Sequence, residues 1–225
     1  MINIDKVFKF AEKFFLKNKE AEHGMDHVMR VYNMAIRLAE GEKVDLEVVK
    51  IATILHDIGK GRESKDHTRK TDHAIESTKI AKPFLIKLKL DDKKINHILD
   101  CIISHRHRTD SKPKTLEAKI VYDADKLDSI GAVGVARAYA WTGRNNCYIY
   151  RKVNIKEYIQ ENMGGNVKGK IIDKTKHSHQ IEWEIKNKHA AKFMYTKKAK
   201  EIARKRIEYH KGFLLKLERE VKGLE

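Results

Sequence analysis

The 225-residue sequence predicts an all-α protein, and two observations indicate this class. Only two prolines, Pro83 and Pro113, interrupt the chain. Apolar residues recur at three- and four-residue steps over long stretches, which is the spacing of amphipathic helices. Because 41% of the residues are hydrophobic, a chain of this length can bury a sizeable core without disulfides or a structural metal.

Six periodic segments are expected to form helices before residue 130. In chain order they lie near residues 7–15, 28–39, 46–55, 72–85, 91–105 and 115–128. Asp72 and Thr115 are candidate N-caps, because their short polar side chains can accept hydrogen bonds from the first amides of a helix. Gly41 is expected to end the second helix, and Gly59 the third.

The pattern changes after a seventh predicted helix at 133–141. Residues 143–188 include Gly164, Gly165 and Gly169, and they indicate a loop-rich excursion with one short helix near 156–162. We interpret the excursion as a cover over a site, a surface insertion or a dimer contact. Apolar periodicity then predicts one long closing helix over 189–222. Without an internal repeat or a low-complexity linker, the simplest organisation is a single domain over 1–225.

The chain carries 48 Lys and Arg against 32 Asp and Glu, a formal net charge of +16. Such an excess is typical of a protein that binds a polyanionic partner, or of one with a Lys-rich solvated surface. Residues 163–225 hold 17 of the basic residues and only 8 acidic ones. The excess is therefore densest away from the motifs described below, which favours the solvated surface.

The compartment is expected to be the cytoplasm. Two cysteines, Cys101 and Cys147, cannot build a disulfide framework and are typical of a reducing environment. The N-terminal residues lack the basic segment and apolar core of a signal peptide. No run approaches the roughly 20 apolar residues of a membrane helix. We therefore expect no membrane association, and oligomeric state is open.

The adjacent pair His56-Asp57 is the most informative feature. A strongly apolar predicted helix ends on this imidazole and carboxylate, and burying both is costly unless each is satisfied. A divalent cation would satisfy both groups, whereas a hydrogen-bonded histidine in a capping role is the structural alternative. His23 and His27 share one helix face upstream. Asp125 and Asp128 are expected on one later helix, where a cation would relieve their repulsion.

These residues carry a resemblance to a known family. The order His27, His56-Asp57, Asp125 resembles the HD superfamily of metal-dependent phosphohydrolases. The flanking segments 23–31 and 123–128 resemble its first and last motifs, over core motifs at 20–140. The closing segment resembles the last helix of small bacterial and archaeal members. The resemblance implies an HD-type helical bundle that holds one metal through these four side chains.

Imidazole and carboxylate ligands suit Mn²⁺, Fe, Co²⁺, Ni²⁺ or Zn²⁺, with Mg²⁺ as a further candidate. Family members with two metals take extra histidines from the intervening helices, where His73 and His105 lie. Asp57 would then bridge both ions. The alternative is that His105 and His107 interact only with a helix C-terminus. The sequence favours a site with one ion, and whether a second ion binds is left open.

The resemblance implies that a metal-activated water attacks phosphorus. Lys60 is a candidate catalytic and phosphate contact, and Arg30 and Arg137 are weaker substrate contacts. A salt bridge to a surface carboxylate is the alternative for Arg137. His23 would relay a proton or support a ligand. Asp128 would orient a ligand or accept a proton, with a helix-interior salt bridge as its alternative.

The predicted function is hydrolysis of a phosphate ester or anhydride of a nucleotide or a related small phosphorylated metabolite. No complete Gly-x-x-x-x-Gly-Lys-Ser/Thr phosphate loop and no Gly-x-Ser-x-Gly elbow occurs. The alternatives are a phosphodiesterase on cyclic or linear oligonucleotides, and a basic non-catalytic protein that binds nucleic acid around a structural metal. For the last, the Lys-rich region 168–222 would be the binding face.

Overall fold

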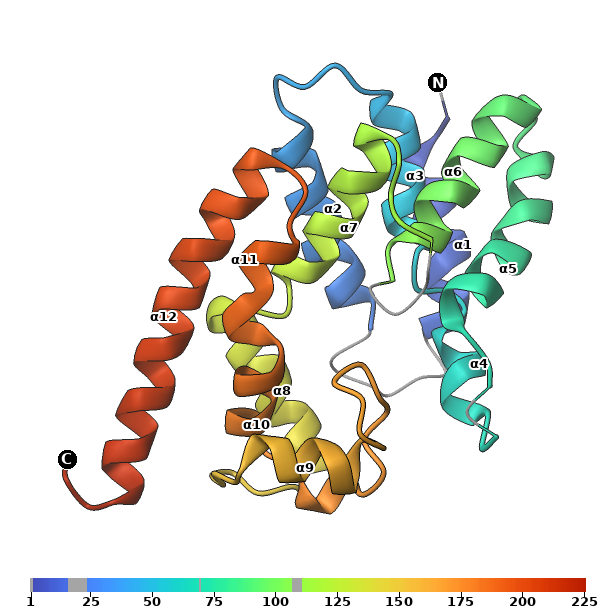
Figure 1. Cartoon of the computed structure of the whole chain (residues 1–225). Coiled ribbons are helices and arrows are strands. Elements are labelled where there is room, and N and C mark those ends of the chain that lie inside the picture. Colours follow the sequence, from blue (N-terminus) through green and yellow to red (C-terminus); the bar gives the residue numbers. More distant parts are fainter. Residues whose placement is uncertain (1, 16–23, 69, 107–110) are drawn as a thin grey trace. The chain divides into compact units, whose positions relative to one another are not determined.

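The computed structural model describes residues 2–15, 24–68, 70–106 and 111–225. Within these residues the secondary structure is helical, apart from an isolated bridge between Tyr148 and Ser178, so the predicted all-α class is confirmed (Figure 1). The chain divides into two compact units, Met1–Asp125 and Lys126–Glu225. The expectation of one domain over 1–225 stays a prediction.

The first unit contains six complete helices among its described residues and most of a seventh. They are α1 Ile4–Phe15, α2 Met25–Ala39, α3 Leu46–Leu55, α4 Lys60–Lys65, α5 His73–Lys87, α6 Asp92–Ser104 and α7 Leu116–Leu127. Asp72 accepts from two amides in the first turn of α5. The Thr115 hydroxyl accepts from the amide of Ala118 at 3.2 Å. Both predicted N-caps are therefore confirmed, while the short helix α4 was not predicted.

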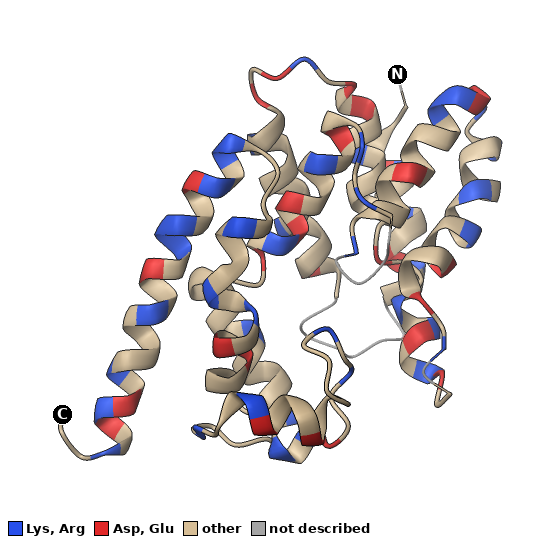
Figure 2. Cartoon of the chain, viewed as in Figure 1, with Lys and Arg blue, Asp and Glu red and all other residues tan. Residues whose placement is uncertain are grey.

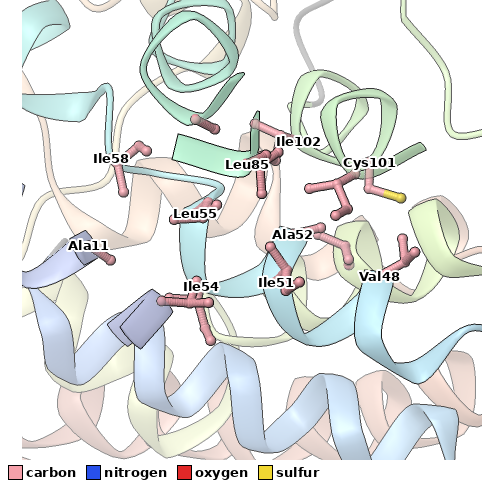
Figure 3. Packing of buried hydrophobic residues seen from close by; sticks show 14 of the residues in the cluster. Ala11, Val48, Ile51, Ala52, Ile54, Leu55, Ile58, Leu85, Cys101 and Ile102 are labelled. Atoms are coloured by element: carbon pink, nitrogen blue, oxygen red, sulfur yellow. The ribbon is translucent and has the colours of Figure 1, made fainter. Parts of the chain in front are cut away.

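The core of the first unit surrounds α3. Seven of its residues are buried: Val48, Val49, Ile51, Ala52, Thr53, Ile54 and Leu55. This helix packs against α1, α2 and α6, and Figure 3 shows its apolar side chains among those of its neighbours. Each fully buried Ile or Leu contributes roughly 1.5–3 kcal/mol. The C-terminal end of α3, where His56 and Asp57 follow, is therefore held on several sides.

The second unit contains α8 Gly131–Arg144, α9 Ile155–Asn162, α10 His179–Ile185, α11 Ala190–Phe193 and α12 Lys197–Val221, with short 3₁₀ turns at Lys174–Lys176 and Asn187–His189. The short helix expected near 156–162 is confirmed as α9. Helix α10, inside the segment expected to be loop-rich, was not predicted. The side chain of Asn162, the last residue of α9, makes two hydrogen bonds with the backbone of Asp173. Its Nδ2 donates to the carbonyl oxygen at 2.9 Å, and its Oδ1 accepts from the amide at 2.8 Å, which ties the following loop to the end of α9.

The closing helix begins later than the expected residue 189. Met194 has an extended backbone, and the Thr196 hydroxyl accepts from the amide of Ala199 at 3.3 Å. This cap starts α12 at Lys197 and separates it from α11. Apolar spacing alone cannot reveal such a break, because the periodicity runs through it.

Charge is unevenly distributed along α12 (Figure 2). Residues 197–211 carry seven Lys and Arg against two Glu, whereas residues 212–225 carry three of each sign. In the second part Lys216, Arg219 and Lys222 pair with glutamates of the same segment. None of the described helices is long and apolar enough to span a bilayer.

Candidate metal centre

His56 and Asp57 are placed by the end of α3. His56 is the residue that terminates this helix, and its Nδ1 lies 2.6 Å from the carbonyl oxygen of Thr53. The amide of Lys60 bonds the carbonyl of Asp57 at 2.9 Å, so a tight turn leads directly into α4. His56 is fully buried and Asp57 is 3% exposed. The apolar helix therefore delivers this polar pair into the interior, as the sequence predicts.

The four predicted ligands of the first ion converge. His27 of α2 brings its Nε2 within 3.3 Å of the Nε2 of His56 and 3.7 Å of Asp57 Oδ2. Asp125 of α7 places Oδ1 at 3.5 Å from His27 and 3.9 Å from His56. Metal bonds of about 2.0–2.2 Å separate neighbouring ligand atoms by roughly 3–3.5 Å, so this spacing suits a cation.

A second donor group lies on the other side of the same carboxylate. The Nε2 of His73, the first residue of α5, is 3.3 Å from Asp57 Oδ1. The Nε2 of His105, which ends α6, is 3.5 Å from that oxygen and 3.2 Å from His73. Oδ2 of Asp57 therefore faces His27 and His56, and Oδ1 faces His73 and His105. His73 and His105 are both buried.

Three of these histidines present the same nitrogen to the cluster. The Nδ1–H of His56 donates to the carbonyl of Thr53, and that of His105 to the carbonyl of Ile102 at 2.5 Å. His73 lies with Nδ1 at 2.8 Å from Oε2 of Glu63. An acceptor at Nδ1 places the hydrogen there and leaves the Nε2 lone pair free. The Nε2 atoms that converge are therefore ready to bind a cation.

Burial favours the neutral form of two of these imidazoles, those of His56 and His73. It lowers the pKa of His56 to about 4, against the opposing attraction of Asp57. It also lowers the pKa of His73, and the charge of Lys60 acts in the same direction. Neutral imidazole is the form that binds metals, so near neutral pH these rings need not lose a proton first.

Glu63 is a residue that the sequence analysis missed. Burial alone would raise its pKa, but the hydrogen bond from His73 and the charge of Lys60 outweigh this and lower it. Its carboxylate also lies 2.8 Å from Arg106, which in turn contacts Asp72 at 2.6 Å. Glu63 lies in a short polar helix with no periodic signal, so only the tertiary contacts reveal it.

Lys60 and Arg30, the candidate substrate-binding residues of the first unit, each pair with an acidic side chain. Lys60 begins α4, and its Nζ lies 2.8 Å from Glu63 Oε2 and 3.4 Å from Nδ1 of His73. It is thus beside the second donor group. Arg30 pairs with Asp26 at 2.7 Å, one helical turn earlier on an exposed face of α2. His23 and His107 lie outside the described residues.

Asp128 and Arg137 contact each other in the second unit. The Asp128 carboxylate is 5% exposed and lies 2.8 Å from Arg137 Nη1. That nitrogen also donates to the carbonyl of Asp128 at 3.2 Å. Helix α7 ends at Leu127, so Asp128 does not share a helix with Asp125 as expected. A salt bridge is thus present for both residues, but its carboxylate is buried and lies beyond the end of α7, rather than at the surface or inside a helix.

Comparisons with known proteins agree with the family resemblance of the sequence. A family model described as HD domain matches residues 24–130. YpgQ of Bacillus subtilis, an uncharacterized protein, is 26% identical over 210 residues, which cover 93% of this chain and 90% of YpgQ. An uncharacterized protein of Clostridium beijerinckii is 32% identical over 54% of this chain and 74% of its own length. Residues 24–130 therefore form an HD domain, as the resemblance implies.

Solved structures share the fold. The crystal structure of Bacillus subtilis YpgQ in complex with ADP matches with a TM-score of 0.72 and 22% identity, and it covers 99% of this chain and 100% of that chain. A predicted HD superfamily hydrolase from an uncultured Thermotogales bacterium matches with a TM-score of 0.63 and 23% identity. The match covers 96% of this chain and 91% of that one. The chain therefore has the fold of HD-superfamily hydrolases.

Proposed function

We propose that this protein is a metal-dependent phosphohydrolase that acts on a nucleotide or a related small phosphorylated metabolite. The observation that carries the proposal is the position of Asp57 between two histidine pairs, with one carboxylate oxygen toward each. Side chains of this kind, buried and converging, are costly without a cation. We extend the proposal to two ions, because His73 and His105 complete a second donor group with Asp57.

Each residue has a role in this proposal. His27, His56, Asp57 and Asp125 hold the first ion, and Asp57, His73 and His105 hold the second. Bound divalent cations lower the pKa of a coordinated water and stabilise charge on phosphoryl oxygens. Lys60, at the start of α4, is proposed to contact a phosphate near the second group, since its Nζ lies 3.4 Å from Nδ1 of His73. Mn²⁺, Fe, Co²⁺, Ni²⁺ and Zn²⁺ suit the ligand set, and Mg²⁺ is included as a test.

A nucleotide is supported as the substrate class by the similarity to YpgQ. That protein was crystallised with ADP, and this chain matches it over nearly all of both lengths. We place the substrate phosphates toward the two ions, since a phosphate offers several oxygens to a pair of cations.

A substrate screen tests the proposal. Nucleoside mono-, di- and triphosphates are incubated with protein and each candidate cation, and free phosphate and pyrophosphate are measured separately. The expected result is metal-dependent release of one of these products, which identifies the bond cleaved. A cyclic dinucleotide and a short RNA are included, because cleavage of these alone would favour the phosphodiesterase alternative.

Variants connect that activity with the centre. Asp57→Asn keeps the volume of the side chain but weakens its binding to both ions. Turnover is expected to fall roughly 1,000-fold, which corresponds to losing about 4 kcal/mol of transition-state stabilisation by the metal. His97→Ala is the matched control, because His97 is a partly exposed histidine of α6 that contacts Thr115 and Glu117. Full activity in Asp57→Asn, with folding intact by circular dichroism, would contradict the proposal.

A further inference from the structure

The three histidines whose Nδ1 contacts are described differ in how they are held. His56 and His105 each follow the last turn of a helix, and each donates to a carbonyl three residues earlier. Unpaired carbonyls are available at this end of a helix. Because these acceptors belong to the main chain, no side-chain substitution removes them.

His73 lies at the opposite kind of helix end. It is the first residue of α5, where the unpaired backbone groups are amides rather than carbonyls. An acceptor for its Nδ1–H must therefore come from another segment. Glu63 of α4 supplies it, with Oε2 at 2.8 Å. The carboxylate is mostly buried, with 14% of the side chain exposed.

Two cations hold Glu63 in this position. Lys60 contacts Oε2 at 2.8 Å from one turn earlier in α4. Arg106 contacts Oε1 at 2.8 Å, and its other nitrogen lies 2.6 Å from Asp72, the N-cap of α5. Arg106 directly follows His105. The network therefore joins α4, the start of α5 and the end of α6, which are the segments that carry His73 and His105.

From this arrangement we propose that Glu63 is a positioning residue for the second ion. It orients the His73 ring, fixes the hydrogen on Nδ1 and makes Nε2 a better donor, as carboxylate partners of metal-binding histidines do. The inference rests on the two-ion centre proposed above. Glu63 is not expected to affect the first ion, because none of its described contacts is with His27 or His56.

Manganese titration of the full chain tests this role. Wild-type protein is stripped with chelator, dialysed and titrated with Mn²⁺ by calorimetry, and bound metal is counted after equilibrium dialysis. We expect two ions per chain. In Glu63→Ala the dissociation constant of one site is expected to rise 10- to 100-fold, as outer partners of metal-binding histidines typically contribute. The other site should be unchanged.

Further variants separate positioning from general damage. Glu63→Gln keeps the shape and an acceptor oxygen but loses the charge, so a smaller rise is expected. Glu76→Gln is the matched control, because Glu76 also binds two cations, Arg62 at 2.7 Å and Lys79 at 2.6 Å, but has no contact with His73 among those described. In a His73→Ala background, Glu63→Gln should have no further effect on manganese binding.

The outcomes are distinguishable. Wild-type protein that binds one ion would overturn the two-ion centre, and this inference with it. Two ions in wild type with unchanged affinities in both Glu63 variants would overturn the role of Glu63 alone. If Glu63→Ala fails to fold, as judged by circular dichroism, the Glu63→Gln titration decides.

Discussion

Gly59 lies so close to His73 that a Cβ at residue 59 would stand 2.5 Å from the His73 carbonyl oxygen. The same Cβ would stand 2.5 Å from the amide nitrogen of Ser77. The Gly59 amide meanwhile donates to the Ser77 hydroxyl at 2.9 Å. Glycine at this position therefore allows the turn after Asp57 to contact the backbone of α5. Through that contact Asp57 and His73 reach the same donor group.

Gly59→Ala is expected to destabilise the protein and weaken the proposed second metal site. The added methyl group meets backbone atoms, which cannot move aside as a flexible side chain can. Overpacking of this kind costs about 1–3 kcal/mol, and we expect the upper end. Urea unfolding measures the loss, and manganese titration measures the site.

Gly212→Ala provides the control for that substitution. A Cβ at Gly212 meets nothing within 4 Å, and the residue lies inside α12. Alanine there should stabilise the helix by about 0.5–1 kcal/mol. Equal stabilities for the two alanine variants would show that the close approach at Gly59 is not a constraint.

Arg137→Ala is expected to lower stability rather than metal binding. Removing the guanidinium withdraws a cation at 2.8 Å from the buried Asp128 carboxylate. Breaking such a pair costs roughly 3 kcal/mol. Arg30→Ala is the control, since Asp26, its partner, is 61% exposed and the pair is worth less than about 1 kcal/mol. A turnover defect in Arg137→Ala without a stability loss would support substrate contact instead.

Much of the fold was predictable because its signals are local. The caps Asp72 and Thr115 act on amides within three residues, and the apolar run of α3 is continuous. The first donor group was predictable for a different reason. His27, His56, Asp57 and Asp125 occur in an order and spacing that resemble the HD family, whose model matches this part of the chain.

Other features depend on contacts between distant segments. Glu63 and Arg106 are 43 residues apart and lie outside any apolar pattern, yet they meet at 2.8 Å. The ionic partners of Lys60 and Arg137 follow only from tertiary placement. The break before α12 depends on the backbone at Met194 and the cap at Thr196, while the apolar spacing continues across it.

The two cysteines are expected to differ in reactivity. Burial raises the pKa of the Cys101 thiol to about 12, and this side chain is fully buried. Cys147 is partly exposed, and its Sγ lies 3.0 Å from the carbonyl of Lys174. Since the thiolate is the reactive form, native protein should label once with a disulfide reagent and twice in denaturant. Cys147→Ser should abolish the native label; its persistence would place Cys101 at the surface.

The buried pair His179–His210 is expected to make the second unit sensitive to acid. Their Nε2 atoms lie 2.6 Å apart, joining α10 to α12, and the side chains are 2% and 0% exposed. Burial lowers the pKa of His179 to about 3, with repulsion from His210 adding to it, and lowers that of His210 to about 4. Both rings are therefore neutral in the folded protein near neutral pH.

The sign of the pH effect follows from these values. Below about pH 6.5 the unfolded chain binds protons at these histidines, while the folded chain does not until about pH 4. The free energy of unfolding should therefore fall as pH drops from 6.5 to 4, by up to about 1.4 kcal/mol per pH unit for each histidine. Trp183, whose ring centroid is 4.9 Å from that of His210, reports unfolding by fluorescence.

The comparison is made in EDTA, so that metal binding does not contribute to the slope. His179→Leu/His210→Leu replaces the titrating pair with apolar side chains of similar size, and its stability should depend less steeply on pH over this window. Other buried histidines, such as His56, contribute equally to both proteins and cancel in the difference. If wild type and variant lose stability in parallel, the pair is not the source of the acid sensitivity.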